Sequence, residues 1–397
     1  MSEWKEYKLG DIAEITSSKR IFYSEYVENG VPFYRSKEII DLFNRRDIQT
    51  ELFITEKRFN EIEVKFGVPM EDDILLTSVG SLGVPYKVKP KDKFYFKDGN
   101  LTWFRNLDKS KVIPDFLFTW ISSNVGKQKL DEVSIGSTQA ALTISGLKTI
   151  EILLPDIKTQ KSIATILSSL DDKIDLLHRQ NITLEKMAET LFRQWFVEEA
   201  KEDWEEISLY DAIELVGGGT PKTTVNEYWD GNIKWLSGGD IAGNHKNFVV
   251  SSEKSITELG LKNSSAKLLP KFSTVISARG TVGKYCMLSE PMTFSQSNYG
   301  ILPKFKNCFF FTYLLVAHSV DELQSAAYGS VFDTITTNTF KGLTITLPEE
   351  EYIIRFNESM EPYFSKILTN QTQIRTLSAL RNTLLPKLMS GVVTIEC

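Results

Sequence analysis

Apolar residues recur at alternating steps of four and three along two long stretches of the chain. In the first stretch the repeat continues without a break for more than four heptads. Its positions are Ile163, Leu167, Leu170, Ile174, Leu177, Asn181, Leu184, Ala188, Leu191 and Trp195. A sustained repeat of this kind is the seam of a coiled coil. We therefore expect a helix from Lys158 to Val197, about 60 Å long at the rise of an α-helix.

The second stretch repeats the pattern 193 residues later. Its positions are Phe356, Met360, Tyr363, Ile367, Asn370, Ile374, Leu377, Arg381, Leu384 and Leu388. A helix lying on its own globular core would also carry one apolar stripe. Because two copies are present, we favour an antiparallel coiled coil within the chain, with Asn181 and Asn370 setting its register. Asp156 is expected to cap the first helix, Pro362 to bend or restart the second, and Gly391 to end it.

Shorter runs with a strand-like pattern precede each helical stretch. They occupy residues 31–35, 73–77 and 148–154 in the first half, and 233–236, 274–277 and 343–347 in the second. Apolar runs at Phe116 and Phe310 are expected to begin short helices. Strands bounded by Gly, Asn, Asp and Pro and mixed with helices predict an α+β class for both halves.

The two halves also repeat each other. Trp4 to Glu14 returns as Trp204 to Glu214, an offset of 200. The same offset relates Gly80 and Gly83 to Gly280 and Gly283. Two later elements repeat at an offset of 193. Gly136-Ser137 returns as Gly329-Ser330, and Leu154-Pro155 returns as Leu347-Pro348. Such a period is too long for a solenoid and indicates two whole domains in a pseudo-two-fold repeat.

This pattern predicts two similar globular domains separated by two long helices that form an antiparallel coiled coil. The globular domains are expected at residues 1–155 and 204–347. The helices are expected at residues 156–203 and 348–397.

Composition narrows the class of protein without naming a partner. The chain has 397 residues, 42% of them hydrophobic and 25% charged, and a net charge of −6. Its apolar runs are too short for a membrane span, and its charged N-terminus argues against a signal peptide. Cys286, Cys308 and Cys397 are isolated, so reduced thiols and a cytoplasmic location are expected. Since nucleic acid prefers basic surfaces, a basic face would have to come from local clustering of Lys and Arg.

Several loops combine small polar residues with Lys or Arg. Hydroxyls, amides and backbone N–H groups beside cations contact phosphates, and Arg, Lys, Asn and Gln also read base edges in the major groove. Loops of this kind can equally be simple turns. The segment 217–223 looks like a phosphate-binding loop, but Pro221 replaces the glycine before Lys222 and has no N–H. We expect a flexible turn there rather than a nucleotide site.

The sequence shows no catalytic constellation. The three histidines offer little general-base capacity and no zinc-ligand spacing. Neither an Asn-Pro-Pro-aromatic methyltransferase tetrapeptide nor a glycine fingerprint for its cofactor occurs. Asp11 and Glu14 recur as Asp211 and Glu214, but their place in a short amphipathic segment favours capping or solvated roles. Catalysis by this chain alone is not expected, and no metal site is predicted.

The duplicated heads, each followed by a coiled-coil helix, resemble the specificity subunit of bacterial type I restriction–modification systems. The resemblance covers essentially the whole chain and depends on the order of several motifs. They are Trp4 with Leu9-Gly-Asp11-Ile, Gly136-Ser-Thr-Gln139, Leu154-Pro155, Gln160, Ile163-Ala, Leu167, Leu170-Asp171-Asp-Lys-Ile174, Gly217-Gly-Gly-Thr-Pro-Lys222, Glu227-Tyr-Trp-Asp-Gly-Asn-Ile, Ser237-Gly-Gly-Asp240-Ile and Leu384-Leu-Pro-Lys-Leu-Met-Ser-Gly391. Two departures concern particular contacts. Where the family has Glu-Gln before the first helix, this chain has Thr159-Gln160, and the second copy has Tyr352-Ile353 at those positions. After the second Gly-Ser, Val331-Phe332 stand in place of Thr-Gln.

The resemblance implies a non-catalytic, DNA-reading adaptor. Each head would read one half of a bipartite, asymmetric site in the major groove, while the helices would set the spacing and dock two methyltransferase subunits. S-adenosylmethionine for adenine N6 methylation, and ATP and Mg²⁺ for restriction by motor–nuclease subunits, would belong to those partners. No cofactor is expected in this chain, and no membrane partner. The alternative is a scaffold that bridges two protein partners without touching DNA, which the acidic net charge favours slightly.

Loop composition, read with this resemblance, gives the candidate contacts to double-stranded DNA. In the first head they are Lys19, Arg20, Arg35, Lys37, Ser78, Ser81 and Gln139. In the second head they are Thr220, Lys222, Ser237, Arg279, Thr281, Lys284 and Asn298.

Overall fold

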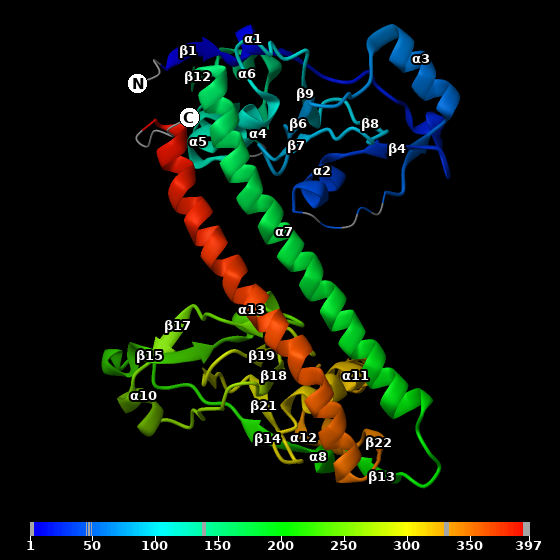
Figure 1. Ribbon diagram of the computed structural model, residues 1–397, viewed down its shortest axis with the longest axis vertical. Helices are drawn as coiled ribbons and strands as arrows, with labels where there is room; N and C mark the ends of the chain where they lie inside the picture. Colours follow the sequence, from blue (N-terminus) through cyan, green and yellow to red (C-terminus); the bar gives the residue numbers. More distant parts are fainter. Residues whose placement is uncertain are drawn as a thin grey trace. The chain divides into compact units, whose positions relative to one another are not determined.

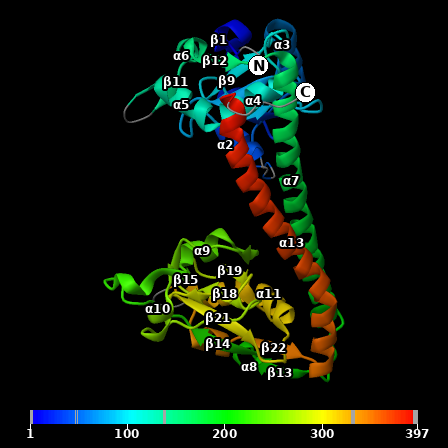
Figure 2. The ribbon, with the colours of Figure 1, turned by 60° about the vertical axis from the view of Figure 1, so that its left-hand side comes forward.

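The structure is a computed structural model that describes residues 4–44, 46, 48, 50–136, 140–328 and 333–391. Contacts divide the chain into two compact units. One contains the described residues up to Asp175 and those from Leu377 onward, and the other contains Leu176–Thr376. Each unit holds one globular head and a part of each of two long helices (Figures 1 and 2).

The first head contains two four-stranded sheets, in the orders β2-β9-β6-β7 and β3-β5-β4-β8, and the pairs β1-β12 and β10-β11. Its strands are β1 (Lys5–Lys8), β2 (Glu14–Thr16), β3 (Tyr26–Val27), β4 (Val31–Tyr34), β5 (Phe53–Ile54), β6 (Ile74–Thr77), β7 (Pro85–Lys87), β8 (Tyr95–Phe96), β9 (Leu101–Arg105), β10 (Ser134–Ile135), β11 (Ala141–Leu142) and β12 (Glu151–Leu154). Its helices are α1 (Leu9–Ile12), α2 (Ser36–Phe43), α3 (Glu56–Phe66), α4 (Pro114–Ser122), α5 (Asn124–Glu132) and α6 (Ile144–Thr149).

The second head contains a five-stranded sheet of order β14-β21-β18-β19-β16, a three-stranded sheet of order β17-β15-β20, and the pair β13-β22. Its strands are β13 (Glu205–Ser208), β14 (Ile213–Gly217), β15 (Trp229–Leu236), β16 (Phe248–Val249), β17 (Lys254–Ile256), β18 (Thr274–Ser277), β19 (Tyr285–Leu288), β20 (Thr293–Phe294), β21 (Asn298–Pro303) and β22 (Thr344–Leu347). Its helices are α8 (Leu209–Ala212), α9 (Gly238–Gly243), α10 (Glu258–Lys262), α11 (Phe309–Tyr328) and α12 (Thr337–Lys341).

The two heads share a topology. The order β2-β9-β6-β7 in the first head corresponds to β14-β21-β18-β19 in the second. In each head the first strand pairs antiparallel with the last, and the corresponding pairs β4-β8 and β15-β20 are parallel. The predicted α+β class and the internal repeat are confirmed. The strand predicted over 148–154 is shorter than expected, because its first residues, up to Thr149, belong to α6.

Two long helices follow the heads. Helix α7 (Ile157–Arg193) continues into a π-helical turn, Gln194–Glu198, and α13 spans Glu350–Met389. Asp156 caps α7, since its carboxylate accepts a hydrogen bond from the Thr159 N–H at 2.9 Å. Gly391 follows the end of α13 with φ +71°, the left-handed conformation that favours glycine at such a position.

Proline does not interrupt the second long helix. The prediction that Pro362 restarts the helix is wrong, because α13 is one helix through Pro362 and Pro386. Pro362 lies on the exposed side, between the buried side chains of Met360 and Phe364. Burial of this apolar face offsets the one backbone hydrogen bond that the proline removes.

The helices run antiparallel within each unit. In the first unit Arg381 Nε lies 2.7 Å from an oxygen of Asp171. In the second unit Asn370 Nδ2 donates to Asn181 Oδ1 at 2.8 Å. Every predicted seam residue is buried or half-buried. The coiled coil expected from the heptad pattern is therefore present within each unit.

The helix ends are part of the cores of the heads. In the first unit Ile163, Leu167 and Leu388 join the cluster around Phe116. In the second, Phe192 and Phe196 contact Phe311 and Phe356, with ring centroids 4.9–5.9 Å apart. The helix ends in each unit thus belong to one of the apolar clusters of its head. Within the described ranges, no helix is both long and apolar enough to cross a membrane.

Candidate nucleic-acid interface

A strand–loop–strand frame recurs in both heads, between β6 and β7 and between β18 and β19. We call the loops 78–84 and 278–284 the paired loops. Gly80 and Gly83 have φ of +79° and +73°, and Gly280 and Gly283 have φ of +77° and +78°. The N–H of the second glycine donates to the carbonyl of the last strand residue, at 2.8 Å in the first head and 2.9 Å in the second. Glycine tolerates this left-handed backbone without strain, so the repeated glycines have a structural cause.

Each paired loop is fixed from both sides by the same backbone contacts. Ser78 N donates to Asn100 O at 2.8 Å, and Ala278 N donates to Ser297 O at 3.0 Å. The carbonyl of Ser78 accepts from Leu142 N at 2.9 Å, and that of Ala278 accepts from Ile335 N at 3.1 Å. Contacts distant in sequence thus hold both loops in one geometry, whatever side chains they carry.

The side chains at the loop tips differ between the heads. Val79, half-buried, stands where the second head has the exposed Arg279. Ser81 and Thr281 are both exposed, and the Thr281 hydroxyl lies 2.9 Å from that of Ser277. The repeated frame therefore presents an apolar tip in one head and a cation in the other.

Several predicted contact residues instead support the fold in this structure. Ser78 is 3% exposed, and its hydroxyl lies 2.6 Å from that of Thr102. Asn298 is 1% exposed and donates to Ser295 Oγ at 2.7 Å. Ser237 caps α9 by accepting from Asp240 N at 3.2 Å. The Ser237–Gly238 turn nevertheless lies close to two of these side chains. A Cβ built on Gly238 would lie 3.8 Å from Thr281 Oγ1 and 3.9 Å from Asn298 Oδ1.

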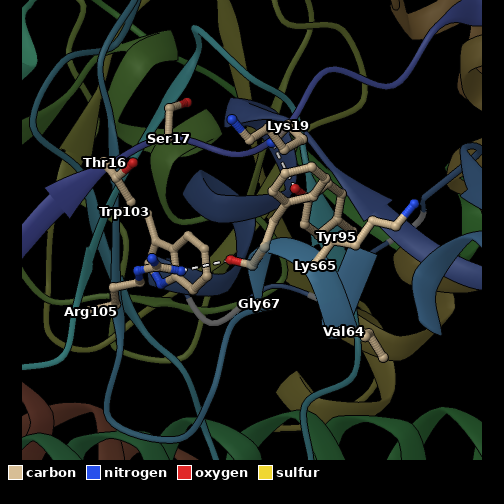
Figure 3. Close-up of a pocket in the computed structure, with 10 residues that line it drawn as sticks. Thr16, Ser17, Lys19, Val64, Lys65, Gly67, Tyr95, Trp103 and Arg105 are labelled. Atoms are coloured by element: carbon tan, nitrogen blue, oxygen red, sulfur yellow. Dashed lines mark hydrogen bonds between the residues drawn. The ribbon is translucent and has the colours of Figure 1, made fainter. Parts of the chain in front are cut away.

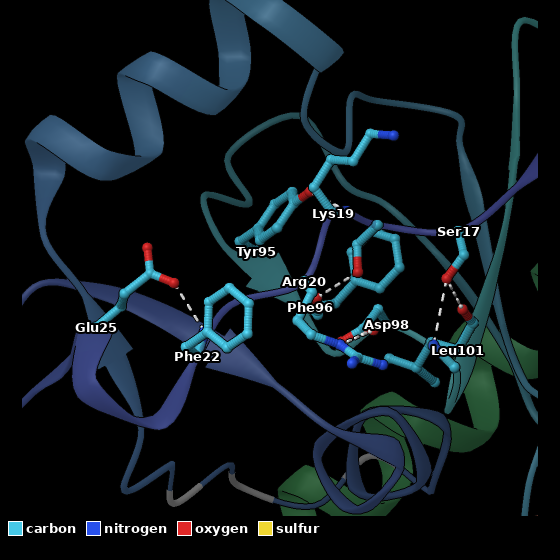
Figure 4. A network of polar contacts seen from close by, with 11 residues as sticks. Ser17, Lys19, Arg20, Phe22, Glu25, Tyr95, Phe96, Asp98 and Leu101 are labelled. Atoms are coloured by element: carbon cyan, nitrogen blue, oxygen red, sulfur yellow. Dashed lines mark hydrogen bonds and ion pairs between the residues drawn. The ribbon is translucent and has the colours of Figure 1, made fainter.

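The predicted cations differ in how far they are already paired. Arg20 is bound to Asp98 at 2.9 Å (Figure 4). Arg35 is half-buried, and its guanidinium forms an ion pair at 2.8 Å with the buried Glu38 in the first turn of α2. Lys19, Lys37, Lys222 and Arg279 are exposed, whereas Lys284 and Thr220 are half-buried. Gln139 lies outside the described residues.

The glycine run before Lys222 is closely packed. A Cβ on Gly218 would lie 2.2 Å from Ser295 O, and one on Gly219 would lie 2.2 Å from Ala266 N. The prediction of a flexible turn is therefore wrong at these two residues, since backbone from other segments lies against them. Trp235 Nε1 also donates to Gly219 O at 2.9 Å.

A polar anchor joins each long helix to its head. Gln160 is fully buried, accepts from Ile113 N at 2.9 Å, and donates to the carbonyls of Lys111 and Pro155 at 2.8 and 2.9 Å. At the aligned position the second copy has Ile353. The corresponding contact there comes from Asn357, one helical turn later. Its Oδ1 accepts from the N–H groups of Phe310 and Phe311 at 3.0 and 3.2 Å. Sequence alignment misses this equivalence because the residue has moved along the helix.

A cleft in the first head was not predicted. It has a volume of about 330 Å³ and lies between the sheet β2-β9-β6-β7 and the end of α3 (Figure 3). Its lining residues are Thr16, Ser17, Lys19, Val64, Lys65, Phe66, Gly67, Tyr95, Trp103 and Arg105. Of these, only Lys19 was a predicted contact, and the fold brings it together with the end of α3 and with Tyr95, Trp103 and Arg105 from distant segments.

The groups that could perform covalent chemistry are mostly buried. Burial raises the pKa of the Cys286 thiol, and it raises that of Cys308 to about 11. Burial also lowers the pKa of His245, whose Nδ1 accepts from Tyr285 N at 3.3 Å. Among the residues that the structure describes, no three His, Cys, Asp or Glu side chains gather as a metal site requires.

Comparison with known proteins agrees with this architecture. The chain matches the type I restriction modification DNA specificity domain twice, over residues 1–186 and 201–380. The type I restriction enzyme MjaIX specificity subunit of Methanocaldococcus jannaschii is 26% identical over 420 residues, which cover 99% of this chain and 94% of that protein. The HindI specificity subunit of Haemophilus influenzae is 24% identical over 481 residues, which cover 99% of this chain and 100% of that protein.

A solved structure shows the same fold. The crystal structure of the type I restriction–modification S subunit from M. genitalium matches with a TM-score of 0.67 at 14% identity, over 100% of this chain and 97% of that one. The two domain matches, one for each head, cover most of the sequence. The chain therefore belongs to the specificity-subunit family of type I restriction–modification systems, with two DNA specificity domains in one polypeptide.

Proposed function

We propose that this chain is the non-catalytic, DNA-reading subunit of a type I restriction–modification complex. Each head reads one half of a bipartite, asymmetric site in the major groove, and the two long helices set the spacing between the half-sites. The helices also dock two methyltransferase subunits. S-adenosylmethionine, and ATP with Mg²⁺ for the motor–nuclease subunits, are bound by those partners. The complex acts in the cytoplasm.

The paired loops carry this proposal. One backbone frame holds Val79 in the first head and the exposed Arg279 in the second. A guanidinium can donate two hydrogen bonds to a guanine edge, whereas an apolar side chain contacts a thymine methyl group. Two readers built on one frame but with different tips are suited to two different half-sites.

The exposed lysines supply the part of binding that does not depend on sequence. Lys37 in the first head and Lys222 in the second are exposed. Phosphate contacts of this kind position a protein on the duplex and make its affinity depend on salt. The net charge of −6 does not oppose this, because binding responds to local cations at the contact surface.

Mapping methylated adenines in cells that carry the chain with its methyltransferase tests the proposal. We expect one asymmetric, two-part motif with a fixed gap. Inserting one heptad into both long helices, at matching seam positions, should change that gap and leave the two half-motifs intact. If the complex forms but shows no salt-dependent binding to DNA and directs no methylation, the chain is a protein scaffold instead.

A further inference from the structure

We propose that the cleft in the first head binds one nucleotide unit, that is, a flat ring carrying a phosphate. The unit is either a free nucleotide or a nucleotide unstacked from DNA. The cleft lies within the first unit, where the ends of β2 and β9 meet the end of α3 (Figure 3). Its volume of about 330 Å³ is at the small end of the range for ligand pockets.

An aromatic surface is available for the ring. Phe66 is 44% exposed at the rim, although large aromatic side chains usually lie in the core. Lys19 Nζ lies 4.9 Å from the centre of the Phe66 ring. Trp103 and Tyr95 form buried walls behind it, and the Arg105 guanidinium lies 4.7 Å from the centre of the Trp103 ring. Bases stack on such aromatic faces regardless of their identity.

Positive charge is available for the phosphate. Lys19, Lys65 and Arg105 line the cleft, and none of the described residues that line it is acidic. Arg105 is partly committed, because Nη2 binds Glu14 at 2.7 Å and Nη1 donates to Phe66 O at 2.8 Å. Its Nε is buried and makes no hydrogen bond within the described part of the chain. Lys19 and Lys65 are both exposed. An anion at this position would therefore meet two exposed lysines and the Arg105 Nε–H that makes no hydrogen bond among the described residues.

The second head offers a built-in contrast. Strand β2 pairs Thr16 with Trp103 and Glu14 with Arg105, whereas β14 pairs Val216 with Gly300 and Glu214 with Leu302. At the places of Trp103 and Arg105 the second head thus has glycine and leucine. A Cβ on Gly300 would lie 2.8 Å from the Phe294 ring, so a core side chain fills this space. The cleft is a property of the first head rather than of the shared fold.

Titration of the full chain with small probes tests the proposal without reference to sequence-specific binding. Deoxynucleoside 5′-monophosphates should bind, as measured by calorimetry, more tightly than either deoxyadenosine or inorganic phosphate alone. Phe66→Ala and Lys19→Ala should each weaken binding at least about fivefold, through loss of stacking and of charge respectively. Met70→Ala and Lys57→Ala are matched controls, since both residues are exposed and neither lines the cleft.

A second arm identifies the source of the nucleotide. Duplexes with one extrahelical 2-aminopurine are compared with fully paired duplexes of the same sequence. The cleft is assigned to a nucleotide of DNA if the bulged duplex binds more tightly and its 2-aminopurine fluorescence is quenched, and if Phe66→Ala restores that fluorescence. This version of the proposal rests on the proposed function. Binding of free monophosphates alone assigns it to a free nucleotide. If neither probe binds, or if binding is equal in Phe66→Ala and Met70→Ala, the proposal is overturned, while recognition of paired DNA by the complex remains a separate result.

Discussion

The two heads build the same loop from different side chains. In each, a glycine pair at positive φ and a pair of backbone contacts from distant segments hold the paired loop. The two glycines are kept and the other side chains differ, with a change of charge from Val79 to Arg279 and from Val84 to Lys284. The comparison separates the residues that make the frame from those that the frame presents. Frame residues should affect stability alike in both heads, whereas tip residues should affect recognition in one head at a time.

The largest effect is expected at the anchors between helix and head. Gln160→Leu removes three buried hydrogen bonds and leaves Ile113 N without its partner, so unfolding should become easier by about 2–4 kcal/mol. Asn357→Leu should cost about 1–3 kcal/mol in the second head, if the two anchors are equivalent. Denaturant unfolding gives the size, and hydrogen exchange shows which head is weakened. Gln373→Leu, at an exposed position of α13, is the control. A neutral Asn357→Leu would contradict the equivalence.

The glycines of the paired loops come next. Gly83→Ala and Gly283→Ala combine a disfavoured φ with close contacts, to Leu130 Cδ1 at 3.0 Å and to the Gln324 side chain at 2.4 Å. We expect a loss of about 2–3 kcal/mol for each. Gly80→Ala and Gly280→Ala meet no atom within 4 Å and should lose about 1 kcal/mol, from φ alone. Thermal unfolding of the four variants checks the order. A different order in the two heads would mean that the frames are not equivalent.

The tip should matter for recognition in one head only. Arg279→Ala is expected to relax base choice at one position of the second head's half-site, by about tenfold, as loss of a two-bond guanine contact does. The other half-site should be unchanged. Methylation mapping of the assembled complex measures both at once. Val79→Ala is the matched change in the first head, where no guanidinium is lost. Equal relaxation of both half-sites by Arg279→Ala would show that this residue acts on the fold and not on a base.

A carboxyl group is largely buried where α7 packs against the second head. Burial raises the pKa of Glu185 on α7 from 4.5 to about 7, with neighbouring Glu189 adding to the shift and Lys246 opposing it. The folded state therefore binds the proton more tightly than the unfolded state. Stability from this group is present below about pH 4.5 and is lost as the pH rises towards and past 7.

Replacing Glu185 should remove this dependence. Glu185→Gln keeps the shape without the charge, so above pH 7 it should stabilise the second unit by about 1–3 kcal/mol relative to the wild type. Unfolding between pH 5 and about pH 8 measures the slope. Glu322→Gln, exposed on α11 of the same unit, removes one carboxylate in the same way and should leave the slope intact. If the free energy of unfolding of Glu185→Gln depends on pH as strongly as that of the wild type, the pH dependence comes from another group.

The smallest effect is expected at the exposed lysines. Lys222→Ala should weaken binding of the complex to all DNA sequences a few-fold and lower the salt slope by about one. Lys262→Ala, exposed at the end of α10, serves as a surface control. Binding at several salt concentrations gives the slope. A change of sequence preference in Lys222→Ala would place this residue with Arg279 among the readers of bases.

Local pattern alone determined the large features of this protein. The two helices follow from a heptad repeat, and the paired heads follow from glycines and apolar runs that recur at a fixed offset. These signals are readable because each depends on neighbours in the chain. The proline at 362 shows the limit of local rules, since packing of Met360 and Phe364 kept α13 continuous.

Only the tertiary structure decided which polar residues face water and which hold the fold. Ser78 and Asn298 carry the right chemistry for DNA contacts but lie buried, while Arg20 is bound to Asp98 from a distant segment. Gly218 and Gly219 pack against backbone from distant segments. The first-head cleft joins residues from 16 to 105 that no local pattern connects. Burial and pairing depend on contacts between distant segments, and these arise only when the chain has folded.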